Sequence, residues 1–314
     1  MLDATHVLDQ IESLILKDNE LNIINEGNQI IQQVFRISQI SSKLTKDEFW
    51  REIIDRGYIL YTATPTDRIQ LLTDIKWSNL IHRIQYLIYY SSQYIPRIQL
   101  DIIKVLRKRG NTNTINLVDI GVGVGTTFIA LISLIQKYNY LVKYRNKNNL
   151  LLIKHVNYYY LDKNPEALNA TQETIQICTN FVFDSTIDIN TYPGQFTLGQ
   201  ETLGDNTNKE NLIITICNVL AELNTTQLDH VAKSLSTLTT DSSVILAEFG
   251  GNNKLVTTLG ERTNKRHLIF QDKNLMYYNG SSLWYNYQRK LAQKRGLRTL
   301  PRGSGKTWTR MLIL

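Results

Sequence analysis

Three glycines at every second position follow an apolar run that contains an acid. The run spans 115–120 and includes Asp119, and a helical pattern starts at Thr126. The glycines are Gly121, Gly123 and Gly125. Glycine lacks a Cβ and adopts positive φ, so such a turn brings backbone N–H groups close to a ligand. A strand, a glycine turn and a helix in this order predict a nucleotide-like ligand at the carboxyl end of the strand.

The glycine spacing excludes a dinucleotide. The dinucleotide fingerprint G-x-G-x-x-G/A, read from Gly121 and Gly123, requires Gly or Ala at position 126, which is Thr126. The other interpretation of the turn is a glycine-rich β-to-α connection that binds nothing.

A second acid ends the next expected strand. The run 156–161 leads into Asp162, and Asn164-Pro165-Glu166 then opens a helix. A carboxylate at the end of this strand can accept hydrogen bonds from both hydroxyls of a ribose. The alternative is N-capping of the helix by Asp162 or Asn164, which both residue types favour.

A third polar position follows the buried strand expected at 212–216. Asn218 stands in the turn after this strand, and a helix is expected at 227–238. One possible role of Asn218 is to cap the helix that follows the turn.

These segments together resemble the class I S-adenosylmethionine-dependent methyltransferases. Asp-x-Gly-x-Gly-x-Gly at 119–125 resembles their first motif, 162–168 their second, and 212–223 their fourth. The resemblance implies that S-adenosylmethionine is the cofactor, with its methionine part against the glycines and its amino group near Asp119. It also implies ribose binding by Asp162, a turn at Asn218 beside cofactor and substrate, and an adenine-contacting acid after strand three.

The position of that last acid depends on strand three, which we expect at 181–183. Asp184 and Asp188 both follow this strand, and Asp184 is favoured. A weaker resemblance links the chain to the mitoribosomal small-subunit methyltransferase-like group, through a helical N-terminal region and Asn-Val-Leu-x-Glu-Leu at 218–223. The chain, with two cysteines, lacks the multi-cysteine cluster of that group.

Helical and alternating patterns divide the chain into two parts. Residues 1–96 predict a helical N-terminal domain, followed by a helix at 97–109 after Pro96. Residues 97–314 predict an α/β methyltransferase domain with a doubly wound, mostly parallel, seven-stranded sheet. Further expected strands are 243–248 and two late antiparallel strands, 268–270 and 308–312.

The charge is uneven and favours a polyanionic partner. The net charge is +7, and 273–314 holds nine Lys and Arg with no acid, while the remaining residues hold 26 basic and 28 acidic side chains. Aromatic residues lie between these cations: Tyr277, Tyr278, Trp284, Tyr285, Tyr287 and Trp308. Bases stack on such rings while cations pair with phosphates, so we expect RNA binding by this segment. A solvated helix face is the alternative.

Other classes of function find no support. The two cysteines and five histidines show no metal-ligand spacing, and no apolar run is long enough to span a membrane. The acidic N-terminus is no targeting signal, so we expect a cytoplasmic protein without membrane contact. The sequence designates no catalytic residue. It predicts a methyltransferase acting on RNA; the alternatives are a non-catalytic RNA-binding or assembly protein that keeps the fold, and a methyltransferase for protein or a small molecule.

Overall fold

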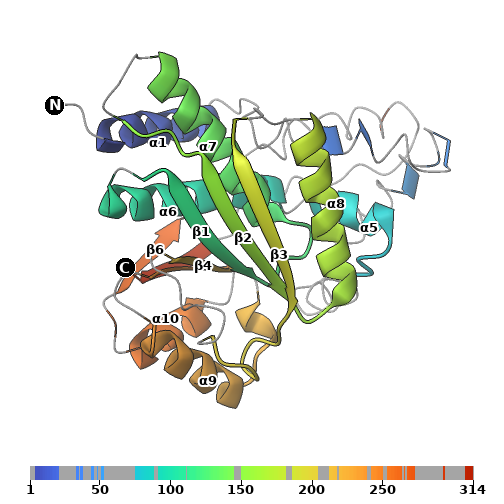
Figure 1. Ribbon diagram of the computed structural model, residues 1–314. Coiled ribbons are helices and arrows are strands. Elements are labelled where there is room, and N and C mark those ends of the chain that lie inside the picture. The colour runs from blue at the N-terminus through green and yellow to red at the C-terminus, as the bar shows by residue number, and fades with distance from the viewer. Residues whose placement is uncertain are drawn as a thin grey trace.

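The protein is built on one seven-stranded sheet, seen in a computed structural model (Figure 1). The structure describes residues 4–20, 33–34, 36–37, 44–45, 48, 51–52, 75–87, 91–110, 112–144, 150–181, 186–203, 212–217, 219–238, 242–249, 253–263, 265, 267–272, 293 and 308–313.

The strand order is β3-β2-β1-β4-β5-β7-β6. The strands are β1 Thr114–Ile120, β2 His155–Asp162, β3 Asp188–Gln195, β4 Leu212–Cys217, β5 Ser243–Phe249, β6 His267–Asp272 and β7 Trp308–Ile313. Strands β1 to β5 pair in parallel, while β7 pairs antiparallel with both β5 and β6. The doubly wound α/β fold expected from the sequence is confirmed.

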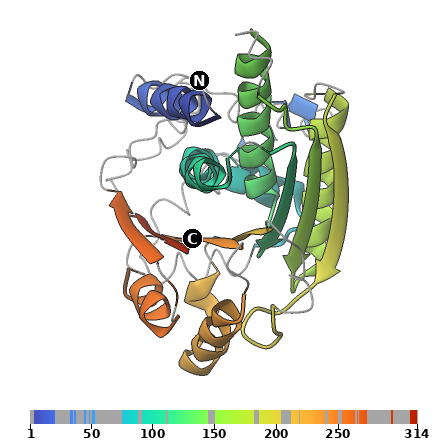
Figure 2. The ribbon, with the colours of Figure 1, turned by 60° about the vertical axis from the view of Figure 1, so that its left-hand side comes forward.

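Helices cover both faces of the sheet. They are α1 Ala4–Glu20, α5 Leu80–Tyr86, α6 Ser92–Arg109, α7 Thr126–Tyr144, α8 Pro165–Phe181, α9 Thr225–Ser236 and α10 Asn253–Arg262, with a short 3-10 helix η3 at Leu220–Glu222. Helices α1, α6 and α7 lie on one side of the sheet, and α9 and α10 lie on the other (Figure 2).

Alternating side chains of the strands contribute to two separate hydrophobic cores, one on each face of the sheet. On β1, Ile115 and Leu117 join the core formed with α1, α6, α7 and α8, whereas Val118 and Ile120 join the core under α9 and α10. This alternation follows from the two-residue period of a strand. Because the strand is buried on both faces, its sequence reads as a nearly continuous apolar run.

The described part of the N-terminal region shares the first core. Val7, Leu8 and Ile11 of α1 are buried in it. The guanidinium of Arg107 on α6 also pairs with Asp9, at 2.6 Å, and with Glu12. Helix α1 is therefore held to the α/β body both by apolar packing and by charge. Among the described helices, none combines the length and the hydrophobicity of a membrane span.

Two expectations about element bounds were wrong. Helix α6 starts at Ser92 and contains Pro96, so it runs through the position expected to separate the two domains. Proline removes one helical hydrogen bond, and the burial of Tyr94, Ile95 and Ile98 around it compensates. Strand three is β3, beyond the expected 181–183, because α8 continues to Phe181.

Strand β3 forms one edge of the sheet. Its side chains are largely exposed, and it contains Pro193. Tyr192 stacks on Tyr159 of β2, with the ring centroids 4.5 Å apart. The expected strand was an apolar run, and this edge strand has none because neither of its faces lies deep in a core.

Candidate functional site

The glycine turn follows β1 and is tightly packed. Gly121, Gly123 and Gly125 have φ of 76°, 55° and 78°. The Gly121 amide donates to the carbonyl oxygen of Leu161 at 2.8 Å. A Cβ on Gly121 would lie 2.2 Å from Cγ2 of Val219, which follows β4. The backbone after β1 therefore touches the turn after β4, and only glycine allows this approach.

The turn lies where the winding of the sheet reverses. From β1 the chain moves to β2 and β3 on one side, then crosses to β4 on the other side. The connections after β1 and β4 therefore leave toward opposite faces of the sheet. In open α/β sheets, ligands bind outside the carboxyl ends of the strands at this reversal.

Asp162 connects the end of β2 to the glycine turn. Its Oδ2 accepts from the Gly123 amide at 3.4 Å, and its Oδ1 accepts from the Asn164 amide at 2.9 Å. Burial raises the pKa of this carboxyl, and the two amide donors partly offset the effect. The Asn164 side chain accepts from the Glu166 amide at 2.9 Å in the first turn of α8. Helix capping therefore falls to Asn164, and the Asp162 carboxylate lies against the glycine turn.

Asp119 lies beneath the turn, on the face covered by α7. Its side chain is 2% exposed. The Tyr158 hydroxyl donates to one carboxylate oxygen at 2.8 Å, and the Thr215 hydroxyl donates to the other at 2.7 Å. Burial raises the pKa of Asp119 to about 6, although these hydroxyls and that of Thr127 lower it. Contact between Asp119 and a ligand stays a prediction.

Trp77 lies against the same turn. A Cβ on Gly123 would lie 3.2 Å from the Trp77 ring, so the indole lies directly against the turn. The Ser78 amide donates to Glu166 at 3.2 Å, and Arg83 pairs with Glu173 at 2.7 Å. These contacts fix the segment 75–87 on α8. No sequence signal connects Trp77 to a glycine so far away in the chain.

Two of the expected site residues, Asp184 and Asn218, lie outside the described residues. Strand β3 begins at Asp188, so Asp184 precedes the strand and Asp188 opens it, whereas both were expected to follow it. Asp188 pairs in register with His155 at the start of β2. Both residues lie at the amino ends of the strands, whereas the glycine turn lies at the carboxyl ends. Asp188, the less favoured of the two candidates for the adenine contact, therefore lies away from the turn. The assignment of Asp184 stays a prediction.

The residues at the carboxyl end of β3, Gln195 in the strand and Phe196 after it, were missed. Gln195 pairs in register with Asp162, and the Phe196 amide donates to the Asp162 carbonyl oxygen at 3.1 Å. Gln195 is exposed and Phe196 is buried. The available signal was the polar, alternating stretch 188–195, which ends in Gly194-Gln195-Phe196.

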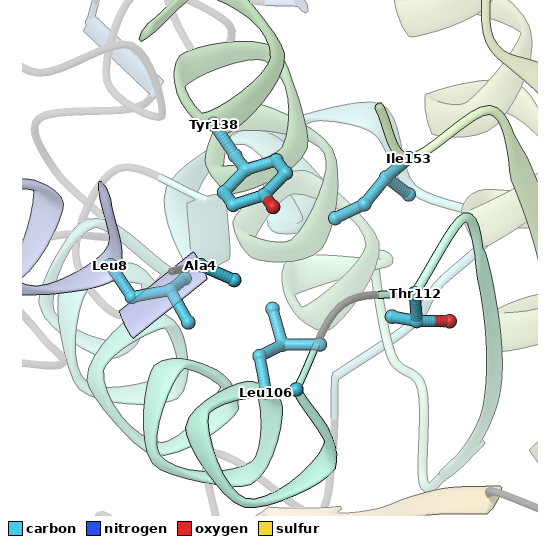
Figure 3. A pocket seen from close by; sticks show the side chains of 7 residues that line it. Ala4, Leu8, Leu106, Thr112, Tyr138 and Ile153 are labelled. Carbon is cyan, nitrogen blue, oxygen red and sulfur yellow. The ribbon is translucent and has the colours of Figure 1, made fainter. Parts of the chain in front are cut away.

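An apolar pocket occurs near the amino ends of the strands (Figure 3). It is lined by Ala4, Leu8, Leu106, Gly110, Thr112, Tyr138 and Ile153. Gly110 and Thr112 precede β1, and Ile153 precedes β2, so the pocket lies at the amino ends of the strands. It is remote from the glycine turn and contains no ionisable chemistry beyond the Tyr138 hydroxyl.

The two cysteines differ in their burial. Cys178 is buried in α8, and burial raises the pKa of its thiol to about 12. Cys217 is half-buried at the end of β4. Within the described ranges, no group of three His, Cys, Asp or Glu side chains could hold a metal ion.

The structure is similar to several solved methyltransferases. One is the small RNA methyltransferase HEN1, at 12% identity over 71% of this chain and 25% of that one, with a TM-score of 0.43. Another is the plantazolicin methyltransferase BamL in complex with SAH, at 10% identity over 85% and 96% of the two chains, with a TM-score of 0.40. A third is a TehB-like SAM-dependent methyltransferase from Corynebacterium glutamicum, at 9% identity over 72% and 88%, with a TM-score of 0.37.

These similarities are distant. This chain spans a quarter of the length of the HEN1 chain. No family model matches the sequence. No curated protein matches it either. Conclusions about function therefore rest on the residues of the site.

Gly121→Ala tests the close approach of the two turns. Alanine at positive φ costs about 1–2 kcal/mol, and overpacking adds about 1–3 kcal/mol. Gly110 is a matched control, because its φ is 75° and a Cβ there would meet nothing within 4 Å. Urea unfolding should show a loss for Gly121→Ala that exceeds the loss for Gly110→Ala. Equal losses of unfolding free energy in the two variants would mean that overlap with Val219 adds nothing to the cost of the Gly121→Ala substitution.

Asp119 should make stability depend on pH. Its folded pKa of about 6 lies above the ordinary value of 3.8, so the fold binds the proton more tightly than the unfolded chain does. The stability that this group contributes is therefore fully present below about pH 4 and is lost as pH rises to about 6, by roughly 3 kcal/mol. Urea unfolding across this range should show a larger fall in the wild type than in Asp119→Asn, which keeps the other titrating groups. Parallel pH profiles would contradict the assignment.

Proposed function

We propose that this protein is an S-adenosylmethionine-dependent methyltransferase. The observation that carries the proposal is the contact between the Asp162 carboxylate and the Gly123 amide, where the winding of the sheet reverses. This contact brings a ribose acceptor and a turn open to close approach into one place, as the sequence resemblance predicts. The seven strands and the reversed β7 support the same proposal.

The residues present fit the cofactor. A Cβ on Gly121, Gly123 or Gly125 would meet Val219, Trp77 or Thr171 at 2.2, 3.2 and 3.3 Å, so these three side chains pack directly against a turn that has none of its own at the glycines. Asp162 supplies acceptor oxygens for two hydroxyls. S-adenosylmethionine, when bound, supplies a methyl group on a positively charged sulfur, which leaves as a neutral thioether.

The protein's own residues position this group. Asp162 exchanges the long hydrogen bond from Gly123, at 3.4 Å, for ribose hydroxyls. Lys163 pairs with Glu222 at 2.5 Å and so joins the end of β2 to η3 across the same edge of the sheet. Trp77 shields the turn from water on the side of α5. Alignment of acceptor, methyl group and sulfur then supplies much of the rate, so methyl transfer needs little help from a protein base.

RNA is the acceptor that we propose. Support comes from the nine cations and the absence of acids in 273–314, a charge pattern typical of polyanion binding. Apart from residues 293 and 308–313, this segment lies outside the described residues. Arg310 stands on β7, next to β5, which attaches the end of the segment to the sheet.

Calorimetry tests the cofactor site. We expect the wild type to bind S-adenosylmethionine, and Asp162→Asn to weaken binding by roughly 10- to 100-fold, because hydrogen bonds to a charged group are worth about 1.5–3 kcal/mol. Asp188→Asn is the matched control and should change nothing, since Asp188 lies at the opposite edge of the sheet. A folded wild-type protein that binds neither S-adenosylmethionine nor its product would sink the proposal.

Transfer of a labelled methyl group tests the acceptor. The protein is incubated with labelled cofactor and separate whole-cell RNA and protein fractions. We expect label in RNA, and less of it with Asp162→Asn. Label in protein or in small molecules would overturn the choice of RNA. Cofactor binding with no label in any fraction would support a non-catalytic RNA-binding or assembly protein that keeps the fold.

A further inference from the structure

The last turn of α7 carries an exposed pair of stacked aromatic rings. Tyr140 is 64% exposed and Tyr144 is 75% exposed. Their ring centroids lie 5.9 Å apart, and the ring planes differ by 15°. Residues four apart lie on the same helix face, so the helix itself holds the two rings parallel.

Packing does not account for these rings. The first part of α7, from Thr126 to Ile135, is fully buried, and near the end of the helix Tyr138, Asn139 and Val142 still point into the core. Asn139 fixes this end firmly, because its side chain makes hydrogen bonds of 2.8 and 2.9 Å to the backbone of Ile153. Tyr140 and Tyr144 therefore project from a rigid support.

The sequence on both sides of these two rings is basic. From residue 120 to residue 161 the sequence contains no Asp or Glu, and it contains five Lys and Arg: Lys137, Lys143, Arg145, Lys147 and Lys154. Lys143 and Lys154 are exposed, and Lys137 is half-buried. Arg145 and Lys147 belong to 145–149, outside the described residues. The sequence here favours a negatively charged partner.

This end of α7 lies far from the glycine turn. Helix α7 starts at the turn and ends at the amino edge of the sheet, where it rises beyond the strands (Figures 1 and 2). The axial distance from Thr126 to Tyr140 is about 20 Å, at about 1.5 Å per residue. A ligand on the two rings would therefore lie outside the candidate cofactor site.

We propose that Tyr140 and Tyr144, with Lys137 and Lys143 of the same helix, form a docking platform for single-stranded RNA. Unpaired bases stack on the tyrosine rings, and the lysines pair with the phosphates on either side, which is the usual division of work in single-strand binding. An A-form duplex would hide its base faces, so the exposed rings favour a single strand. The proposal rests on the RNA part of the proposed function and adds a contact outside 273–314.

The test measures binding of a short fluorescein-labelled oligouridylate to the full chain, without cofactor. Tyr140→Ala/Tyr144→Ala should weaken binding by about tenfold or more, since each stacked base contributes about 1–3 kcal/mol. Tyr140→Phe/Tyr144→Phe keeps the rings and should bind like the wild type. Lys143→Gln should reduce the slope of log affinity against log salt by about 0.7, the loss of one phosphate contact.

Tyr192→Ala is the matched control, because Tyr192 is another exposed tyrosine, 43% exposed, stacked on its neighbour at the β3 edge. Unchanged affinity of Tyr140→Ala/Tyr144→Ala would overturn the platform, as would an equal loss with Tyr192→Ala. A wild-type protein that does not bind the oligouridylate would overturn both the platform and the choice of RNA. Failure of methyl transfer with intact oligouridylate binding would overturn the enzyme alone.

Discussion

The contact between Gly121 and Val219 constrains the whole carboxyl edge of the sheet. Any side chain on Gly121 would overlap Val219, at 2.2 Å for the first added atom. The turns after β1 and β4 therefore meet at the carboxyl ends of the strands. The Asp162 carboxylate and the Trp77 ring both lie against the next glycine, Gly123, so their positions depend on this first contact.

Much of the fold could be predicted because buried strands have a distinct sequence. Strands β1, β2, β4 and β5 lie in the interior of the sheet, and each reads as an apolar run between polar residues. Strand β3 lies at the edge, and its exposed side chains leave no such run. The position of β3 also decides where the acids considered for the adenine contact lie. An acid that precedes the strand lies at its amino end, and one that follows it lies at its carboxyl end.

Only part of the candidate site could be predicted from the sequence. The glycine turn and Asp162 could be predicted because each is a local pattern after a strand. The partners of Asp119 could not be predicted, because Tyr158 and Thr215 meet it only through the registers of β2 and β4. Trp77 reaches the site through tertiary packing alone, and its neighbours in the sequence give no signal of this contact.

The exposed edge strand also bears on how copies of the chain can meet. An unpaired edge offers a row of backbone groups to which another strand can add, which promotes association and fibril growth. Proline is tolerated in an edge strand where its missing N–H faces solvent, and there it interrupts that row. Pro193 is the sixth of the eight residues of β3, and the charged Asp188 is the first. The β3 edge therefore resists the addition of a strand from another copy of the chain.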